Sequence, residues 1–183
     1  MCRPIAGLVI LKQLIKQAEG YMESVVMKIE TYSGKYDDEI IALILKIQNN
    51  EAKINLSLEE QPDLKNTKSY YQGSGGEFWI ARSNDKVIGT LGLILRENNC
   101  AVMKKFFVDS AYRSQKVGLA LYKKLLAFAI LMEVHHIILD TPSVATASHK
   151  FYENAGFYKT DLEHLHIPYK YPDHNSILYV LDL

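Results

Sequence analysis

The sequence predicts a mixed α/β fold in which helices flank one sheet. Three consecutive strand-like segments in the middle of the chain are separated by turns of three polar residues, which predicts an antiparallel meander. An amphipathic helix and a further apolar strand follow the meander, a succession typical of a right-handed parallel crossover. The 183 residues, 48% of them hydrophobic, suffice for one domain with a sizeable core, and no Pro-, Gly- or Ser-rich linker divides them.

The first part of the chain is expected to form one strand and two helices. Residues 24–32 are rich in strand-forming side chains and stop at a Ser-Gly pair. Asp37 or Asp38 can cap the helix that follows, whose body is almost wholly apolar. Residues 57–60, Ser-Leu-Glu-Glu, have the capping-box pattern, so a second helix is predicted to begin near Leu58.

The meander and the crossover occupy the middle of the chain. Strands are predicted over residues 77–82, 86–96 and 100–108, because short polar turns separate these extended segments. A helix is predicted from about residue 114 to 133, since apolar side chains recur on one side of it at helical spacing. Residues 136–140 form an apolar run typical of a buried strand, and this strand completes the crossover.

The last part of the chain is expected to add one helix and two strands. Residues 146–154 are predicted to be helical, and Gly156 suits the left-handed residue that ends such a helix. Residues 157–164 and 177–183 are predicted strands, joined by a polar and aromatic loop over residues 166–175. The complete order of elements is therefore β-α-α-β-β-β-α-β-α-β-β.

The charge balance and the cysteines restrict the partners and the compartment. Lys plus Arg equals Asp plus Glu at 21 each, so the chain lacks the basic excess of a domain whose main partner is nucleic acid. Cys2 and Cys100 form neither a CxxC pair nor a disulfide framework, which suits a reducing compartment. The apolar stretch over residues 5–11 lacks a cleavage pattern and is far shorter than the about 20 residues that span a bilayer. We expect a cytoplasmic protein with neither a nucleic-acid nor a membrane partner.

Residues 1–23 are expected to form an extension that precedes the domain over residues 24–183. An amphipathic helix is predicted over residues 8–18, because leucine, isoleucine and alanine side chains gather on one side of it. This apolar side is expected to pack on the body of the domain or on a second subunit. In the second case the protein would be a homodimer.

The junction between the strand over residues 100–108 and the helix after it has the features of an anion site. The first N–H groups of a helix have no partner within the helix, and the helix dipole places partial positive charge there. Arg113 and Lys116 add two cations to the same turn. The turn is therefore expected to bind an anion. For the loop taken alone, the alternative is a solvated segment that only caps the helix.

Two stretches carry a resemblance to a known family. Residues 107–121, Phe-Val-Asp-Ser-Ala-Tyr-Arg-Ser-Gln-Lys-Val-Gly-Leu-Ala-Leu, are similar to a motif in which an aliphatic strand end leads through Tyr-Arg-Gly-x-Gly-Ile-Gly into a helix. Residues 151–157, Phe-Tyr-Glu-Asn-Ala-Gly-Phe, match the pattern Phe-Tyr-Glu-x-x-Gly-Phe. With the order of elements, these motifs resemble the GNAT superfamily of acyl-CoA-dependent N-acyltransferases. The resemblance implies a GNAT-like N-acetyltransferase domain over residues 24–183.

The resemblance implies that acetyl-CoA is the co-substrate and that the turn before the helix holds its pyrophosphate. It also implies that the N–H of Phe107 or Val108 polarises the thioester carbonyl and that Tyr152 donates a proton to the departing thiolate. A phenol suits that step because its ordinary pKa, about 10, is close to that of an alkyl thiol. For Tyr152, the alternative is a core aromatic beside Phe151 and Phe157. The residues expected to contact the cofactor are Phe106, Phe107, Val108, Arg113, Ser114, Gln115, Lys116, Val117, Gly118, Leu119, Ala120 and Tyr152.

The chain departs from the family pattern at several positions. The usual proline is Ser110 here, and two loop glycines are Ser114 and Lys116, although each of these residues keeps its backbone N–H. The Asn that often precedes the Phe-Tyr pair falls at Ala145. The glutamate frequently found on the strand before the loop falls at Val102, which removes a common candidate for the general base.

The sequence leaves the general base open. The acidic and imidazole side chains that could take this role are Glu97, Asp109, Glu163, His164 and His166. Each of them can equally be a surface polar residue. His164 and His166 alternate on a strand-like segment without a third ligand in evidence, so no metal site is expected.

The favoured function is transfer of an acetyl group from acetyl-CoA to a primary amine, on a small molecule or a peptide, by direct attack in a ternary complex. Such a transfer needs an uncharged amine, a stabilised oxyanion and a proton for the thiolate. Because Val102 replaces the family acid, the alternative is a catalytically weak acyl-CoA-binding sensor or interaction module. Glu59, Glu60 and Asp63 lie where the family builds its acceptor wall and could attract a cationic amine, and an exposed helix face explains them equally well.

Overall fold

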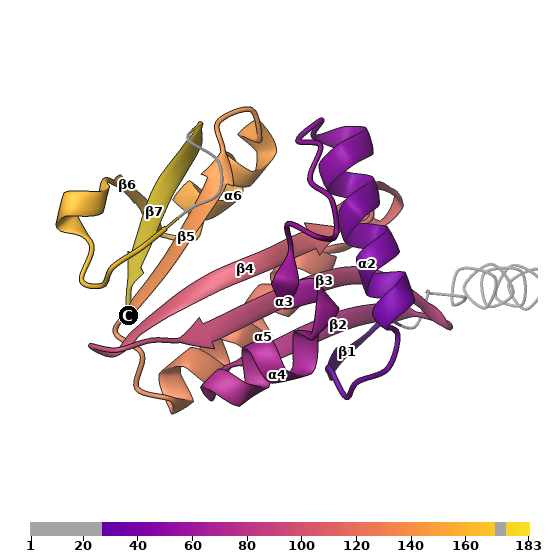
Figure 1. The fold of residues 1–183 in the computed structure, drawn as a ribbon, viewed down its shortest axis with the longest axis horizontal. Coiled ribbons are helices and arrows are strands. Elements are labelled where there is room, and N and C mark those ends of the chain that lie inside the picture. The colour runs from indigo at the N-terminus through magenta and orange to yellow at the C-terminus, as the bar shows by residue number, and fades with distance from the viewer. Residues whose placement is uncertain (1–26, 171–174) are drawn as a thin grey trace, which may run out of the picture.

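The computed structural model describes residues 27–170 and 175–183, and within these residues it forms one seven-stranded sheet (Figure 1). The strand order is β1-β2-β3-β4-β5-β7-β6, and neighbouring strands are antiparallel except for β4 and β5, which are parallel. The strands are β1 Met27–Thr31, β2 Glu77–Ser83, β3 Lys86–Leu95, β4 Cys100–Val108, β5 His136–Pro142, β6 Tyr158–Thr160 and β7 Ser176–Asp182. The predicted meander and the predicted parallel crossover are both confirmed.

Helices cover both faces of this sheet (Figure 1). Short helices and the longer α2 lie over one face, where Ile40, Leu64 and Phe78 share one buried apolar cluster. The opposite face carries α5, and Leu121 and Leu125 pack there with side chains of β2, β3 and β4. The helices are α2 Asp37–Leu45, α3 Pro62–Lys65, α4 Thr67–Tyr71, α5 Val117–Leu131 and α6 Thr146–Asn154, and a π-helical segment, η1 Lys46–Glu51, extends α2.

Two predicted helix starts are wrong. The residue that precedes α2 is Tyr36, in the left-handed conformation, and Asp37 lies in the first turn, where it accepts a hydrogen bond from the Tyr32 hydroxyl. The Ser57–Glu60 capping box does form, with the Ser57 N–H and hydroxyl donating to the Glu60 carboxylate at 2.9 and 2.7 Å. It closes a turn rather than a helix. The helix α3 begins only at Pro62, because proline has no N–H to donate and fits the first helical position.

The strand predicted over residues 157–164 is much shorter than expected. Strand β6 ends at Thr160, and Asp161 then caps a 3₁₀ turn, accepting hydrogen bonds from the N–H groups of Glu163 and His164 at 3.1 and 3.2 Å. A side chain that bonds to the backbone in this way competes with strand pairing. Gly156, with φ of 94°, ends α6 as predicted.

The predicted N-terminal helix over residues 8–18 lies outside the described residues. The first residues of the predicted strand over 24–32 and the centre of the loop over 166–175 do so as well. Within the described residues, no helix is long and apolar enough to cross a membrane.

Gly76 lies where the chain enters β2 against β3. A Cβ at this position would lie 2.1 Å from the carbonyl oxygen of Leu93, and that backbone atom is fixed within the sheet. We expect Gly76→Ala to lower the free energy of unfolding by about 2–3 kcal/mol, measured by urea denaturation. Gly73→Ala is the matched control, because nothing lies within 4 Å of its Cβ. Equal losses for the two variants would contradict the steric explanation.

Candidate active site

The candidate site is the place where β4 and β5 separate. The two strands pair at three positions, from Cys100 opposite His136 to Val102 opposite Ile138, although β4 continues to Val108. Beyond Val102 the β5-facing edge of β4 therefore has no strand partner among the described residues. Such an edge offers unpaired N–H and C=O groups to an amide-bearing ligand.

A bulge in β4 lies within this open stretch. Lys104 pairs with Gly92 and Phe107 with Thr90, so two residues of β4 face the single Leu91 of β3. Lys105, one of the two, has φ of 53° and its carbonyl oxygen accepts a hydrogen bond from the Thr90 hydroxyl at 2.7 Å. A bulge of this kind re-aims the residues that follow it.

Hydrogen bonds decide which amides of β4 face the open edge. The Asp109 N–H donates to the carbonyl oxygen of Ile88 on the β3 side at 2.9 Å. Because successive backbone groups along the regular part of a strand point to opposite edges, Phe107 also faces β3, whereas Val108 faces the open edge. Of the two amides expected to polarise the thioester, the geometry therefore excludes Phe107 and leaves Val108.

The N-terminus of α5 lies against the same end of β4. Gly118 packs on Phe106 and Val108, since a Cβ at Gly118 would lie 3.3 Å from the Phe106 ring and 3.7 Å from the Val108 side chain. The Ala120 N–H already donates to the Lys116 carbonyl oxygen at 3.0 Å, so it is not part of the anion site. The amides left without a partner inside the helix are those of Val117, Gly118 and Leu119.

The guanidinium of Arg113 is engaged by residues outside this helix start. Its guanidinium forms an ion pair with Glu51 of η1, and its Nε–H donates to the carbonyl oxygen of Val108 at 3.1 Å. The Glu51 carboxylate offsets the charge of Arg113 in this structure, and the contact of Arg113 with an anion stays a prediction. Ser114 and Gln115 are exposed, and Lys116 is a cation with no ion-pair partner in the described part of the chain.

Lys116 has a backbone conformation that favours glycine. Its φ is 60°, a left-handed geometry that costs a residue with a Cβ roughly 1–2 kcal/mol. We expect Lys116→Gly to raise the free energy of unfolding by about 0.5–1 kcal/mol and to weaken CoA binding, because the cation is lost. Lys116→Ala should weaken CoA binding to the same extent with no gain in stability. Urea denaturation and calorimetry measure the two effects, and a gain for the alanine variant would contradict this explanation.

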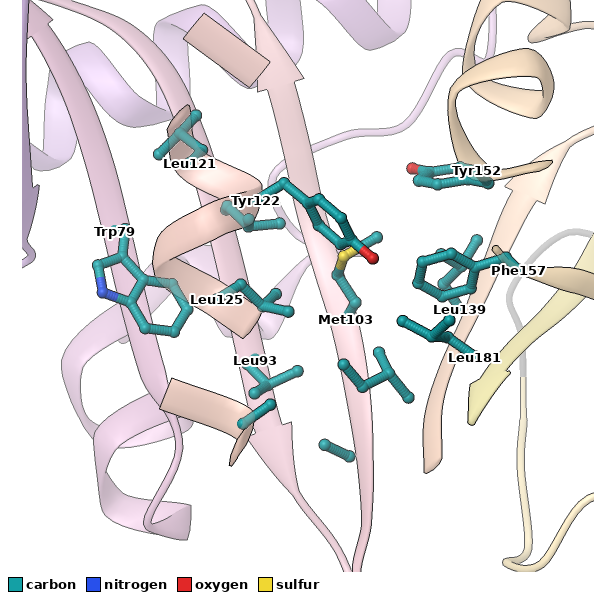
Figure 2. Close-up of a cluster of buried hydrophobic side chains, with 14 of the residues drawn as sticks. Trp79, Leu93, Met103, Leu121, Tyr122, Leu125, Leu139, Tyr152, Phe157 and Leu181 are labelled. Atoms are coloured by element: carbon teal, nitrogen blue, oxygen red, sulfur yellow. The ribbon is translucent and has the colours of Figure 1, made fainter. Parts of the chain in front are cut away.

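Tyr152 lies across the strand separation from α5. Figure 2 shows Tyr152 and Phe157 facing Tyr122 and Met103 across the line where β4 and β5 diverge. Tyr152 is 6% exposed, and its ring lies 6.3 Å from Phe106 between centroids. Burial raises the pKa of Tyr152 well above its ordinary value, and the charge of Asp140 raises it further. The Tyr152 phenol is therefore a weaker acid than a free phenol, and its pKa no longer matches that of an ordinary alkyl thiol.

A second phenol on α5 lies beside this group. The hydroxyl of Tyr122 is buried and has no hydrogen-bond partner among the residues described, and burial raises its pKa to about 12. Its ring is 5.5 Å from Phe151 and 6.3 Å from Phe157, both neighbours of Tyr152. A buried polar atom without a partner is costly, so a ligand that supplies one would be stabilised here.

The five sequence candidates for the general base lie away from the separation of β4 and β5, or are already engaged. Asp109 is buried and binds the ammonium groups of Lys86 and Lys46 at 3.2 and 3.5 Å. Burial alone would raise its pKa, but the Ala111 N–H and the two lysines lower it overall. Its role is to cap the 3₁₀ turn before α5.

The other four candidates lie in exposed turns. Glu97 belongs to the turn before β4, at the opposite end of that strand from Val108, and pairs with Arg96 at 3.7 Å. His166 stacks on His136 at the same end, with ring centroids 4.1 Å apart. Glu163 and His164 lie in an exposed 3₁₀ turn, where the His164 ring is 2.6 Å from the Asp161 carboxylate.

Sequence reasoning missed the charged residues that do line the separation. Asp140 on β5 accepts a hydrogen bond from the Tyr169 hydroxyl at 2.6 Å. Lys105 on β4 donates to Gln61 at 2.6 Å and lies 3.4 Å from Asp63, so the predicted acidic wall contributes a buried ion pair there. The sequence feature that could have pointed to Asp140 is its position as a single carboxylate at the end of an otherwise apolar strand. Such a carboxylate is rare without a function or a partner. In the described ranges, no group of three His, Cys, Asp or Glu side chains could hold a metal ion.

Comparison with known proteins identifies the class. The model of the acetyltransferase (GNAT) family matches residues 41–157, which is more than half of the chain. The chain therefore belongs to the acetyltransferase (GNAT) family. The matched region contains the bulge of β4, the start of α5 and Tyr152.

Individual relatives agree with this class. The chain is 35% identical over 107 residues to N-acetylaspartate synthetase from Xenopus tropicalis and 30% identical over 123 residues to N-acetyltransferase 8B from Homo sapiens. These matches cover 57% and 64% of this chain, but the chain spans only 40% and 54% of those proteins. An acetyltransferase from Streptococcus agalactiae superposes with a TM-score of 0.83 and 37% identity, covering 86% of this chain and 98% of that one. A GNAT acetyltransferase from Staphylococcus aureus gives 0.80 and 35%, over 86% of this chain and 99% of its own.

Proposed function

We propose that this chain transfers the acetyl group of acetyl-CoA to a primary amine, on a small molecule or a peptide, by direct attack in a ternary complex. One observation carries the proposal: the open edge of β4 ends beside both the unpaired amides of α5 and the buried phenol of Tyr152. The helix start suits a pyrophosphate, and the open edge suits the amides of a pantetheine arm. The unpartnered hydroxyl of Tyr122 gives further support to a polar ligand in this place.

The reaction requires one bond to form and one to break. The amine nitrogen attacks the thioester carbon, a C–N bond forms, and the N–H of Val108 stabilises the oxyanion of the tetrahedral intermediate. The C–S bond then breaks, and the thiolate takes the proton of Tyr152. The proton that the amine loses returns to the phenol through solvent. Desolvation raises the pKa of Tyr152 and would raise that of a thiol held beside it in the same direction, which would keep donor and acceptor matched.

The test is acceptor-dependent release of the CoA thiol. The full chain would be incubated with acetyl-CoA and a panel of polyamines, aminoglycosides, amino acids and peptides, with the thiol measured by a chromogenic disulfide. Release that depends on the amine, with an N-acetyl product in mass spectrometry, is the expected result. Absence of release with every amine would contradict the proposed transfer.

The second candidate is a module that binds acyl-CoA without efficient transfer. It is favoured by Val102, a buried apolar residue at the position where the family often has its acid. In this case calorimetry would give CoA binding while no amine of the panel is acetylated. Turnover with any one acceptor would exclude the module as the main role.

A further inference from the structure

Lys104 is a half-buried cation beside the open edge of β4. It lies two residues beyond Val102, the last residue of β4 that pairs with β5. No hydrogen bond or ion pair joins its ammonium group to another residue in ranges 27–170 and 175–183. A cation that is partly removed from water without a partner is costly, and an anionic ligand would offset that cost.

Asp140 occupies the matching position on β5. Asp140 lies two residues beyond Ile138, and Ile138 pairs with Val102 in the last pair of β4 and β5. Lys104 lies two residues beyond Val102, so the parallel register places Lys104 and Asp140 opposite each other just after the two strands separate. Residues two apart on a strand share a face. Val102 and Ile138 belong to one buried cluster against which Tyr169 packs, and Tyr169 also contacts Asp140.

The electrostatic surroundings agree with this placement. Burial lowers the pKa of Lys105, and the nearby charge of Lys104 lowers it further, whereas the charges of Asp63 and Asp140 raise it. The four charged side chains therefore lie close to one another. Lys105 and Asp63 neutralise each other as a buried pair 3.4 Å apart. The charges left over are a cation at Lys104 and an anion at Asp140, on opposite sides of the separation. The anion is also close enough to Tyr152 to raise the pKa of that phenol.

We infer that the acceptor is a zwitterion of the α-amino acid class, with its ammonium group on Asp140 and its carboxylate on Lys104. The inference rests on the proposed acetyl transfer and specifies its substrate. Lys104 and Asp140 carry opposite charges on neighbouring strands. This arrangement favours a ligand that has both a negative and a positive group over a ligand that has only one of them. An amine without a carboxylate would leave Lys104 unpaired, and a carboxylate without an amine has nothing to acetylate.

Matched acceptors test the inference on the unmodified protein. Each amino acid of a panel, acidic and neutral, would be compared with its C-terminal amide and with the amine left after decarboxylation. We expect kcat/KM to fall by about 10- to 100-fold when the carboxylate is removed, since a partly buried charge pair is lost. Equal or better turnover of amides and simple amines would overturn the inference and leave acetyl transfer intact. Absence of turnover with every amine would instead contradict the proposed function.

Variants locate the effect at Lys104. Lys104→Gln should raise KM for an amino-acid acceptor about 10-fold or more, with KM for acetyl-CoA unchanged, and should make no difference with the decarboxylated amine. Lys104→Arg should restore most of the activity. Lys123→Gln is the control, because that lysine is exposed on α5. An equal loss with both kinds of acceptor, or no loss with either, would overturn the role of Lys104. Calorimetry of CoA binding verifies that the variant folds.

Discussion

Tyr152→Phe is expected to lower kcat by about 100- to 1,000-fold, within the range of about 100- to 10,000-fold typical of general acid catalysis. The dissociation constant of CoA should change by less than about two-fold, because the ring that packs among Phe106, Phe151 and Phe157 is kept. The thiolate would then leave without a proton. Steady-state kinetics with saturating amine and calorimetry with CoA measure the two quantities separately.

The pH dependence of the reaction gives a second measure of the same phenol. Burial first, and then the charge of Asp140, raise the pKa of Tyr152 above its ordinary value of about 10. A phenol is protonated below its pKa, so the raised pKa extends the protonated form to higher pH. Activity should therefore not fall between about pH 7 and 10 through ionisation of Tyr152.

The control for this prediction is Tyr158→Phe. Tyr158 lies on β6, is 48% exposed, and its hydroxyl donates to Asp182 at 3.1 Å. That variant loses a phenol hydroxyl as well, but on the edge strand β6, where β7 lies between it and β5, and it should keep its kcat. If Tyr152→Phe keeps its kcat over the whole pH range, Tyr152 is a core aromatic and not the proton donor.

Elements that depend on local pattern could be predicted from the sequence. Short polar turns between segments rich in strand-forming residues predict the meander, and apolar side chains at helical spacing between two strands predict the α5 crossover. The direction and the order of these strands could therefore be predicted. The predicted pyrophosphate loop and Tyr152 could be singled out because their residues are contiguous in two short motifs, and their roles stay predictions. The α2 and α3 starts were wrong because cap chemistry also forms turns, and Pro62 decided where the helix could begin.

Contacts between residues far apart in the sequence could not be predicted from the sequence. Arg113 meets Glu51, 62 residues away, and no local signal links the two. The opposition of Lys104 and Asp140 follows from the register of β4 and β5, which is known only once Val102 is found opposite Ile138. Register is set by the packing of whole strands and cannot be read from either segment alone.

Asp63→Ala is expected to lower the free energy of unfolding by about 3–5 kcal/mol, the range measured when one partner of a buried ion pair is removed. The Asp63 carboxylate is 6% exposed, lies 3.4 Å from the ammonium group of Lys105, and accepts a hydrogen bond from the Tyr71 hydroxyl at 2.8 Å. Its removal leaves a charge and a fully buried hydroxyl without this partner. Urea denaturation measures the loss.

A double variant separates the ion pair from simple loss of packing. In Asp63→Ala with Lys105→Met, the charge that would be stranded is removed and an apolar chain of similar length fills its place, so much of the lost stability should return. Glu59→Ala is the control, because Glu59 pairs with Lys65 at 3.8 Å on the surface, where both side chains are largely exposed, and it should change stability by less than about 1 kcal/mol. If the double variant is as unstable as Asp63→Ala, the loss comes from the cavity and the Tyr71 hydroxyl rather than from the charge.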